Sequence, residues 1–213
     1  RLGRLARTTE DKAFVAWDAA AASLDRILAV RIRELEARRQ RGEGVVIARS
    51  YDDVQRGLGE RETDLILQRY VVGCEFGVFY YRHPNRVSGD IFAITEKRLQ
   101  IVEGDGRRTL ERLILDHPRA VAVAAHYFRS NRDRLGWIPD IGERVQLSEL
   151  GVHSRGAIFK DGGRLGTPAL SDAVDRLARR IEGFHFGRFD VRSPSVEAFM
   201  AGHFAVIELN GVT

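Results

Sequence analysis

Two short segments near the end of the chain carry the residue types best suited to chemistry. The first reads Gly-Arg-Phe-Asp-Val at residues 187–191, and the second reads Glu-Leu-Asn at residues 208–210. In both, apolar residues alternate with polar ones, so the polar side chains would share one face if both segments are strands. Asp190, Glu208 and Asn210 would then present three oxygen donors to one point, as a Mg²⁺ ion beside nucleotide phosphates requires. Taken alone, either segment is better explained as a half-buried strand with a polar outer face.

Composition limits the class of protein that could carry such a site. The chain has 213 residues, of which 44% are hydrophobic and 30% charged, which is typical of a globular protein with one sizeable core or two small lobes. No apolar stretch approaches the ~20 residues of a membrane span, so we expect no membrane contact. A single cysteine, Cys74, excludes an intramolecular disulfide and favours a reducing compartment, with the cytoplasm as the expected location.

The net charge of +4 raises the question of nucleic-acid binding. The basic residues are interleaved with 30 acidic ones and form no long run, so we expect no nucleic-acid partner. An anionic small molecule such as a nucleotide explains the mild positive balance equally well. The sequence does not decide between a monomer and an oligomer. Because the chain starts at Arg1 and stops three residues after Asn210, we expect a fragment of a longer protein, cut at both ends.

The elements that must position the polar segments are read from periodicity. Residues 9–40 carry apolar side chains at helical spacing, which predicts a helix and an N-terminal helical segment over residues 1–42. From residue 44 onward short strand-like runs alternate irregularly with helical stretches, which predicts an α+β fold with a mixed or antiparallel sheet. We expect strands at residues 45–48, 65–71, 75–82, 91–97, 145–147, 157–159, 187–192 and 206–211. We expect helices at residues 109–116, 171–181 and 196–200, and one more that follows residue 118 and runs to about residue 131.

A second candidate site lies where two of these strands meet. Gln68, Arg69, Tyr70 and Val71 end an apolar strand, a glycine turn follows, and Glu75 begins the next strand. Backbone groups of the first strand could pair with an adenine edge, and Glu75 could accept hydrogen bonds from ribose hydroxyls. We expect Glu75 to be exposed, so that its replacement by alanine would weaken ATP binding and leave the stability of the protein nearly unchanged. Alone, the pattern is that of a hairpin with an exposed glutamate.

Taken in order, these segments resemble the ATP-grasp superfamily of carboxylate-amine ligases. Residues 40–45 are similar to the end of the family's glycine-rich loop, residues 67–78 to its adenine hinge, and residues 102–114 to a Gly-Asp-Gly segment of its cyanophycin synthetase branch. Residues 187–191 and 208–210 are similar to the pattern in D-alanine:D-alanine ligases and glutathione synthetases. The resemblance implies an ATP-grasp catalytic region over residues 43–213, with the end of a small lobe and the hinge at 43–72 and a large lobe at 73–213.

The resemblance also implies roles for individual residues. Asp190, Glu208 and Asn210 become ligands of two Mg²⁺ ions, and Arg188 stabilises charge on the transferring phosphoryl group. Arg155, in a weaker local match, lies where relatives bind substrate or phosphate. ATP is expected against Gln68, Arg69, Tyr70 and Val71, with Glu75 at the ribose. Lys97 could reach a phosphate, although an isolated lysine at a strand end is as often solvated surface.

Two departures from the family pattern affect the expected activity. Relatives carry a lysine on a strand just before the glycine-rich loop, whereas residues 33–39 here read as helix and contain no lysine. The substrate domain that precedes this strand in relatives is also expected to lie outside these 213 residues. The predicted function is an ATP- and Mg²⁺-dependent ligase acting on small-molecule carboxylate and amine substrates, and the alternative is a degenerate nucleotide-binding domain without ligation. From residues 1–213 alone we expect weak, magnesium-dependent ATP binding and little turnover.

Overall fold

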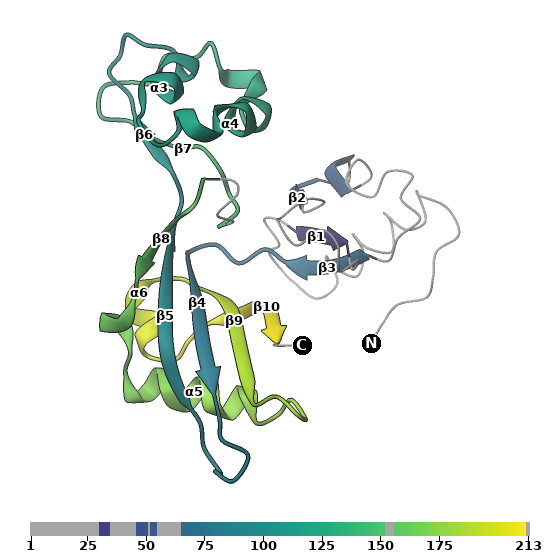
Figure 1. Ribbon diagram of the computed structural model, residues 1–213. Helices are drawn as coiled ribbons and strands as arrows, with labels where there is room; N and C mark the ends of the chain where they lie inside the picture. The colour runs from purple at the N-terminus through teal and green to yellow at the C-terminus, as the bar shows by residue number, and fades with distance from the viewer. Residues whose placement is uncertain (1–29, 35–45, 51, 55–64, 152–155, 212–213) are drawn as a thin grey trace. The chain divides into compact units, whose positions relative to one another are not determined.

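The computed structural model of the protein describes residues 30–34, 46–50, 52–54, 65–151 and 156–211. The chain divides into two compact units, residues 1–71 and 72–213. In the first unit, β1 (Val30–Glu34), β2 (Val46–Ala48) and β3 (Leu65–Arg69) form a three-stranded antiparallel sheet in the order β2-β1-β3. Figure 1 shows these strands in purple to blue.

The central strand of this sheet corrects the N-terminal helix prediction. Residues 30–34 lie within the predicted helix 9–40, yet they form β1 and pair with both neighbouring strands. The local sequence Val-Arg-Ile-Arg-Glu alternates apolar and charged residues and contains two β-branched ones, which suits a strand. Pairing with a strand on each side gives the backbone N–H and C=O groups of β1 hydrogen-bond partners. These contacts with distant residues outweigh the local preference for a helix that the apolar spacing indicated. Residues 9–29 and 35–40 of the prediction lie outside the described residues.

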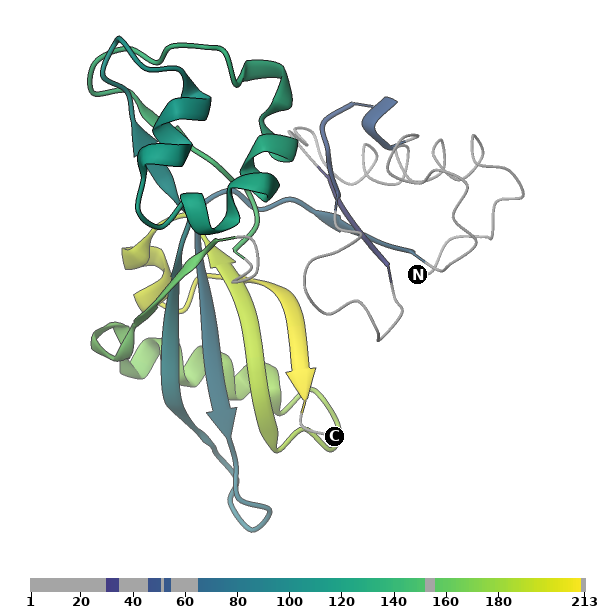
Figure 2. The same ribbon diagram turned by 45° about the horizontal axis from the view of Figure 1, so that its top comes forward.

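The second unit is built on a five-stranded antiparallel sheet in the order β10-β9-β4-β5-β8. Its strands are β4 (Cys74–Tyr81), β5 (Asp90–Arg98), β8 (Ile158–Asp161), β9 (Phe186–Ser193) and β10 (Ala205–Gly211). Two helices, α5 (Pro168–Ala178) and α6 (Val196–Met200), lie along one face of this sheet. Figure 2 shows the same layering after rotation. The α+β class with an antiparallel sheet is therefore confirmed.

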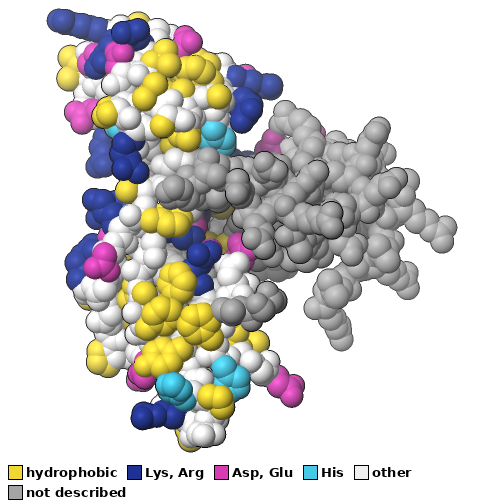
Figure 3. All heavy atoms as spheres, viewed as in Figure 1, with side chains coloured by type: hydrophobic (Ala, Val, Ile, Leu, Met, Phe, Trp, Pro, Cys, Tyr) yellow, Lys and Arg dark blue, Asp and Glu magenta, His cyan; other side chains and the backbone are white. Residues whose placement is uncertain are grey.

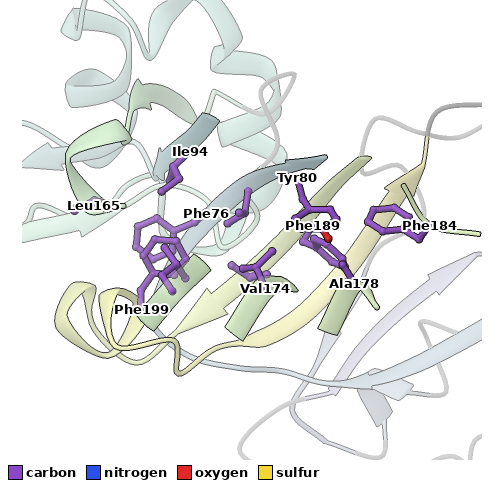
Figure 4. Close-up of a cluster of buried hydrophobic side chains, with 12 residues drawn as sticks. Phe76, Tyr80, Ile94, Leu165, Val174, Ala178, Phe184, Phe189 and Phe199 are labelled. Atoms are coloured by element: carbon purple, nitrogen blue, oxygen red, sulfur yellow. The ribbon is translucent and has the colours of Figure 1, made fainter. Parts of the chain in front are cut away.

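The core of the second unit lies between the sheet and these helices (Figure 4). Phe76 of β4 stacks on Phe199 of α6, with ring centroids 3.8 Å apart, and Val174 of α5 is fully buried nearby. Tyr80 is also fully buried, and its hydroxyl donates to Asp175 Oδ1 of α5 at 2.7 Å. Each buried aromatic ring removes roughly 150–250 Å² from water. One face of the sheet is thus committed to packing, which leaves the other face for the polar residues.

A smaller helical extension completes the second unit. It contains the antiparallel pair of β6 (Ile101–Glu103) and β7 (Arg144–Gln146). Between these strands lie α3 (Leu110–Asp116), α4 (Ala124–Ser130) and the 3₁₀ turns η1 (Val121–Val123) and η2 (Arg132–Arg134), whereas the turn η4 (Gly163–Leu165) lies outside the extension, before α5. The extension has its own core around Leu110, Ile114 and Tyr127, all fully buried. Among the described residues, no helix has the length and apolar character needed to cross a membrane.

Candidate functional site

The candidate site lies on the face of the five-stranded sheet opposite α5 and α6, which we call the open face. On β4 the residues that alternate with the buried Phe76, Val78 and Tyr80 are Glu75, Gly77, Phe79 and Tyr81. Strand register extends each of them into a row across the sheet. The rows are Lys97-Glu75-Arg192, Thr95-Gly77-Asp190-Glu208, Ala93-Phe79-Arg188-Asn210, and Tyr81-Phe186.

The first row is a nearly buried ion-pair network. Lys97 Nζ lies 3.0 Å from Glu75 Oε1 and 3.2 Å from Asp190 Oδ2, and so bridges two carboxylates. Arg192 donates from Nε and Nη2 to Glu75 Oε2, at 3.0 and 2.9 Å. The side chains of Lys97 and Arg192 are only 6% and 5% exposed. Charges held this deeply are stable only when paired, so the row behaves as one unit.

A loop from the helical extension covers this row. Arg192 Nη2 also donates to the carbonyl oxygen of Glu149, at 2.8 Å. Gly151 approaches so closely that a Cβ built there would lie 2.6 Å from Oε1 of Glu75, which only glycine permits. A side chain at position 151 would therefore displace the Glu75 carboxylate or the loop that covers it.

The environment of Glu75 changes its acidity and corrects one expectation. Burial raises the pKa of Glu75, but the positive charges and hydrogen bonds of Lys97 and Arg192 outweigh burial and hold the pKa below its ordinary value. Its side chain is 13% exposed, so the prediction of an exposed glutamate is wrong. The sequence showed the strand but not the two cations that converge on it, which lie 22 and 117 residues away.

The next two rows bring together the residues predicted to hold a metal. In strand register Asp190 of β9 faces Glu208 of β10, and Arg188 faces Asn210. Arg188 Nε lies 2.9 Å from Asp190 Oδ1, and Nη2 donates to Oδ2 at 3.2 Å. The Nε–Oδ1 pair lacks hydrogen-bond geometry, so Asp190 Oδ1 and Arg188 Nε are buried without a hydrogen-bond partner, as is Asn210 Nδ2. Buried polar atoms in this state are rare and need an explanation.

The side chains of Asp190, Glu208 and Asn210 carry the kind of ligand atoms that a hard cation such as Mg²⁺ prefers. Two carboxylates and an amide offer oxygen ligands, and a half-turn of the Asn210 amide exchanges its nitrogen for its oxygen. Gly77 lies beside Asp190, where a Cβ would come within 3.4 Å of Oδ1, so the glycine leaves space at that oxygen. Within the part of the chain that the structure describes, no group of three or more His, Cys, Asp or Glu could hold a metal. The third donor here would have to be Asn210.

The other predicted site residues lie outside the second unit or outside the described residues. Gln68, Arg69, Tyr70 and Val71 belong to the first unit, at and after the end of β3. Arg155 lies outside the described residues. One residue was missed: Arg192 follows Arg188 and Asp190 at the same two-residue spacing, so the alternation already placed it on their face.

The chain was compared with protein-family models, curated proteins and solved structures, and solved structures gave matches. No protein-family model and no curated protein matches the chain. A crystal structure of a bifunctional glutathione synthetase from Pasteurella multocida overlaps 95% of this chain at 18% sequence identity, with a TM-score of 0.45. The chain spans 29% of the length of that synthetase. A likeness at this level carries no argument about the activity of this chain.

Proposed function

We propose that the chain is the nucleotide- and metal-binding region of an ATP- and Mg²⁺-dependent ligase that joins a carboxylate to an amine through an acyl phosphate. The observation that carries the proposal is the register of β9 and β10, which pairs Asp190 with Glu208 and Arg188 with Asn210. This pairing agrees with the ATP-grasp pattern that the two sequence segments resemble. The Asn210 side-chain nitrogen is buried without a hydrogen-bond partner, and Asp190 Oδ1 has only the ion pair with Arg188 Nε, so both side chains could take a metal or phosphate as a further partner.

Each polar residue of the open face has a place in the proposal. Asp190, Glu208 and Asn210 would hold magnesium, which supplies neutralisation of phosphate charge when bound. Lys97 and Arg188, which pair with Asp190, would turn to the phosphoryl oxygens once Asp190 binds the metal, and the guanidinium of Arg188 would also meet the substrate carboxylate that attacks there. Glu75 remains a candidate for the ribose, although it must share its oxygens with Lys97 and Arg192.

The chemistry proposed for the site has two steps. A carboxylate oxygen attacks the γ-phosphorus of ATP, the bond to the bridging oxygen breaks, and ADP leaves with the charge that the cations stabilise. An amine then attacks the acyl carbon, phosphate leaves, and the nitrogen loses a proton. Side chains contribute by positioning and charge neutralisation, as is usual for phosphoryl transfer.

The first unit supports the nucleotide part of the proposal. A strand, β1, lies ahead of residues 40–45, where the resemblance expects a strand carrying a lysine. This strand carries Arg31 and Arg33 instead. An arginine keeps the positive charge and adds a planar set of donors suited to phosphate. Adenine is proposed to bind along the backbone of residues 68–71.

Calorimetric titration with ATP tests the proposal, with magnesium present and after chelation. We expect binding only with magnesium, and a loss of at least tenfold in affinity for Asp190→Asn, since a charged ligand contact is worth about 1.5–3 kcal/mol. Asp172→Asn is the matched control, because Asp172 is exposed on α5. An ATP affinity that changes neither when magnesium is removed nor in the Asp190→Asn variant would refute the proposal.

A second candidate, nucleotide binding without ligation, is favoured by one observation. Asp190 and Glu75 already have protein cations as partners, which must be displaced before a ligand binds. Hydroxylamine separates the candidates, because it traps an acyl phosphate as a hydroxamate whichever amine is the natural substrate. Hydroxamate formed together with ADP indicates a ligase. Magnesium-dependent ATP binding without hydroxamate, across a panel of carboxylates, indicates the second candidate.

A further inference from the structure

An exposed aromatic cluster lies on the open face beyond the charged rows. It consists of Phe79, Tyr81, Phe92 and Phe186, which we call the aromatic cluster. Phe92 is its centre, with ring centroids 5.5 Å from Phe79, 6.0 Å from Tyr81 and 5.6 Å from Phe186, the last a stacked pair. Phe92 and Phe186 remain 50% and 46% exposed. Figure 3 shows hydrophobic side chains gathered on this side of the sheet.

A bulge places Phe92 in the cluster. Phe79 pairs with Ala93 and Tyr80 pairs with Ile91, so Phe92 is an extra residue in β5. Because the bulge interrupts strict alternation, the Phe92 ring reaches the same face as Phe79 and Tyr81. Bulges often re-aim a side chain next to functional sites. Here the bulge gives the open face an apolar surface that folding alone does not require, since the core lies on the other face.

The aromatic cluster is continuous with the charged rows. The Arg188 guanidinium carbon lies 5.6 Å from the centroid of the Phe79 ring, within cation–π distance. Arg188 turns its Nε and Nη2 edge toward Asp190, and its side chain keeps 35% exposure. Successive rows on one face are about 7 Å apart, two strand residues. A ligand whose carboxylate meets Arg188 therefore reaches the Phe92 and Phe186 rings one row further on.

We propose that the carboxylate substrate of this site carries an aromatic body, two or three bonds from its carboxyl group, that stacks on Phe92 and Phe186 while Arg188 binds the carboxylate. The role as substrate rests on the proposed ligase function. The order of the rows supports the assignment. The row with Asp190 would hold the metal and phosphate, and Arg188 in the next row would meet the substrate carboxylate. The aromatic cluster lies beyond Arg188. This sequence of a cation followed by an apolar surface complements an arylalkanoate, whose carboxylate is followed by an aromatic ring.

Ligand-observed NMR titration of the whole chain tests this proposal with three probes: 3-phenylpropionate, acetate and 3-phenylpropionamide. Acetate lacks the ring and the amide lacks the charge. We expect 3-phenylpropionate to bind at least tenfold more tightly than either, and the double variant Phe92→Ala, Phe186→Ala to lose about tenfold in affinity for it. Ile141→Ala is the matched control, because Ile141 is 85% exposed and lies outside the cluster. Both phenylalanines are half-exposed, so the fold should tolerate their loss, and Phe92→Leu provides a milder variant that removes only the aromatic character.

Equal affinities for the three probes, or unchanged binding by the double variant, would overturn the proposal. Light scattering supplies a second way to overturn it: a dimer of the wild type that the double variant dissociates would make the cluster an interface between copies. Calorimetric titration with Mg²⁺ and ATP on the same samples keeps the two proposals apart. If ATP binds while the probes do not discriminate, the substrate proposal fails alone. If the aromatic carboxylate binds while ATP does not, the ligase function fails and the surface keeps its ligand class.

Discussion

Replacing Glu75 with glutamine tests whether the buried ion-pair row stabilises the second unit. The change keeps the shape of the side chain and removes one negative charge between two cations. Lys97 would keep Asp190 as a partner at 3.2 Å, whereas Arg192 would lose both hydrogen bonds to a charged acceptor. The substitution therefore leaves positive charge in excess at a place where the side chains of both cations are at most 6% exposed.

The magnitude follows from that burial. Breaking a fully buried pair by removing one partner costs about 3–5 kcal/mol. The remaining Lys97–Asp190 pair and the carbonyl of Glu149 offset part of this, so we expect Glu75→Gln to lower the free energy of unfolding by about 2–4 kcal/mol. This is a large share of the stability of a typical domain.

Urea unfolding followed by tryptophan fluorescence measures this loss, since Trp137 lies in the second unit. Glu182→Gln is the control, because Glu182 is exposed. The pKa of folded Glu75 is below its ordinary value of 4.5, so its contribution is complete above that pH and is lost as the pH falls through the folded-state pKa. The difference in the free energy of unfolding between the wild type and Glu75→Gln should therefore become smaller at acidic pH. A loss no larger than that of Glu182→Gln at neutral pH would show that the ion-pair row does not stabilise the second unit.

Two further predictions concern the packing of Tyr80 and the glycine turn before β4. The raised pKa of Tyr80, about 12, comes from burial and then from its hydrogen bond to Asp175, so the folded state keeps a proton that the unfolded state releases above pH 10. Stability should therefore fall by up to nearly 3 kcal/mol between pH 10 and 12. Denaturant curves of Tyr80→Phe should lack this component, and an identical alkaline loss in the variant would contradict it. Gly73→Ala should destabilise by more than about 1 kcal/mol, because Gly73 has φ +129° and a Cβ would meet the carbonyl oxygen of Ser193. An unchanged thermal midpoint would argue against that backbone conformation.

The sequence predicted the sheet of the second unit well because its signals are local. The strands around Asp190 and Glu208 alternate polar and apolar residues, and β9 and β10 form as expected, with the polar residues in facing register. Where a strand is regular, as at residues 188–192, alternation fixes which residues share a face. The same rule would have added Arg192 to the candidate set.

Other features depended on contacts that sequence alone does not show. The strand β1 was hidden by apolar spacing that also suits a helix, and its pairing with two strands decided its structure. The burial of Glu75 depends on cations from β5 and β9 and on the approach of Gly151. The position of Phe92 depends on a bulge, which shifts the face of a side chain without a distinct sequence signal.

The most direct test of the central claim is a crystal structure of the protein with Mg²⁺ and a non-hydrolysable ATP analogue. We expect magnesium about 2.1 Å from side-chain oxygens of Asp190, Glu208 and Asn210. We also expect the Lys97 and Arg188 side chains to have moved from Asp190 to phosphate oxygens. Magnesium bound to other residues, or a nucleotide bound while Lys97 and Arg188 keep their pairs with Asp190, would show that these residues do not form the proposed site.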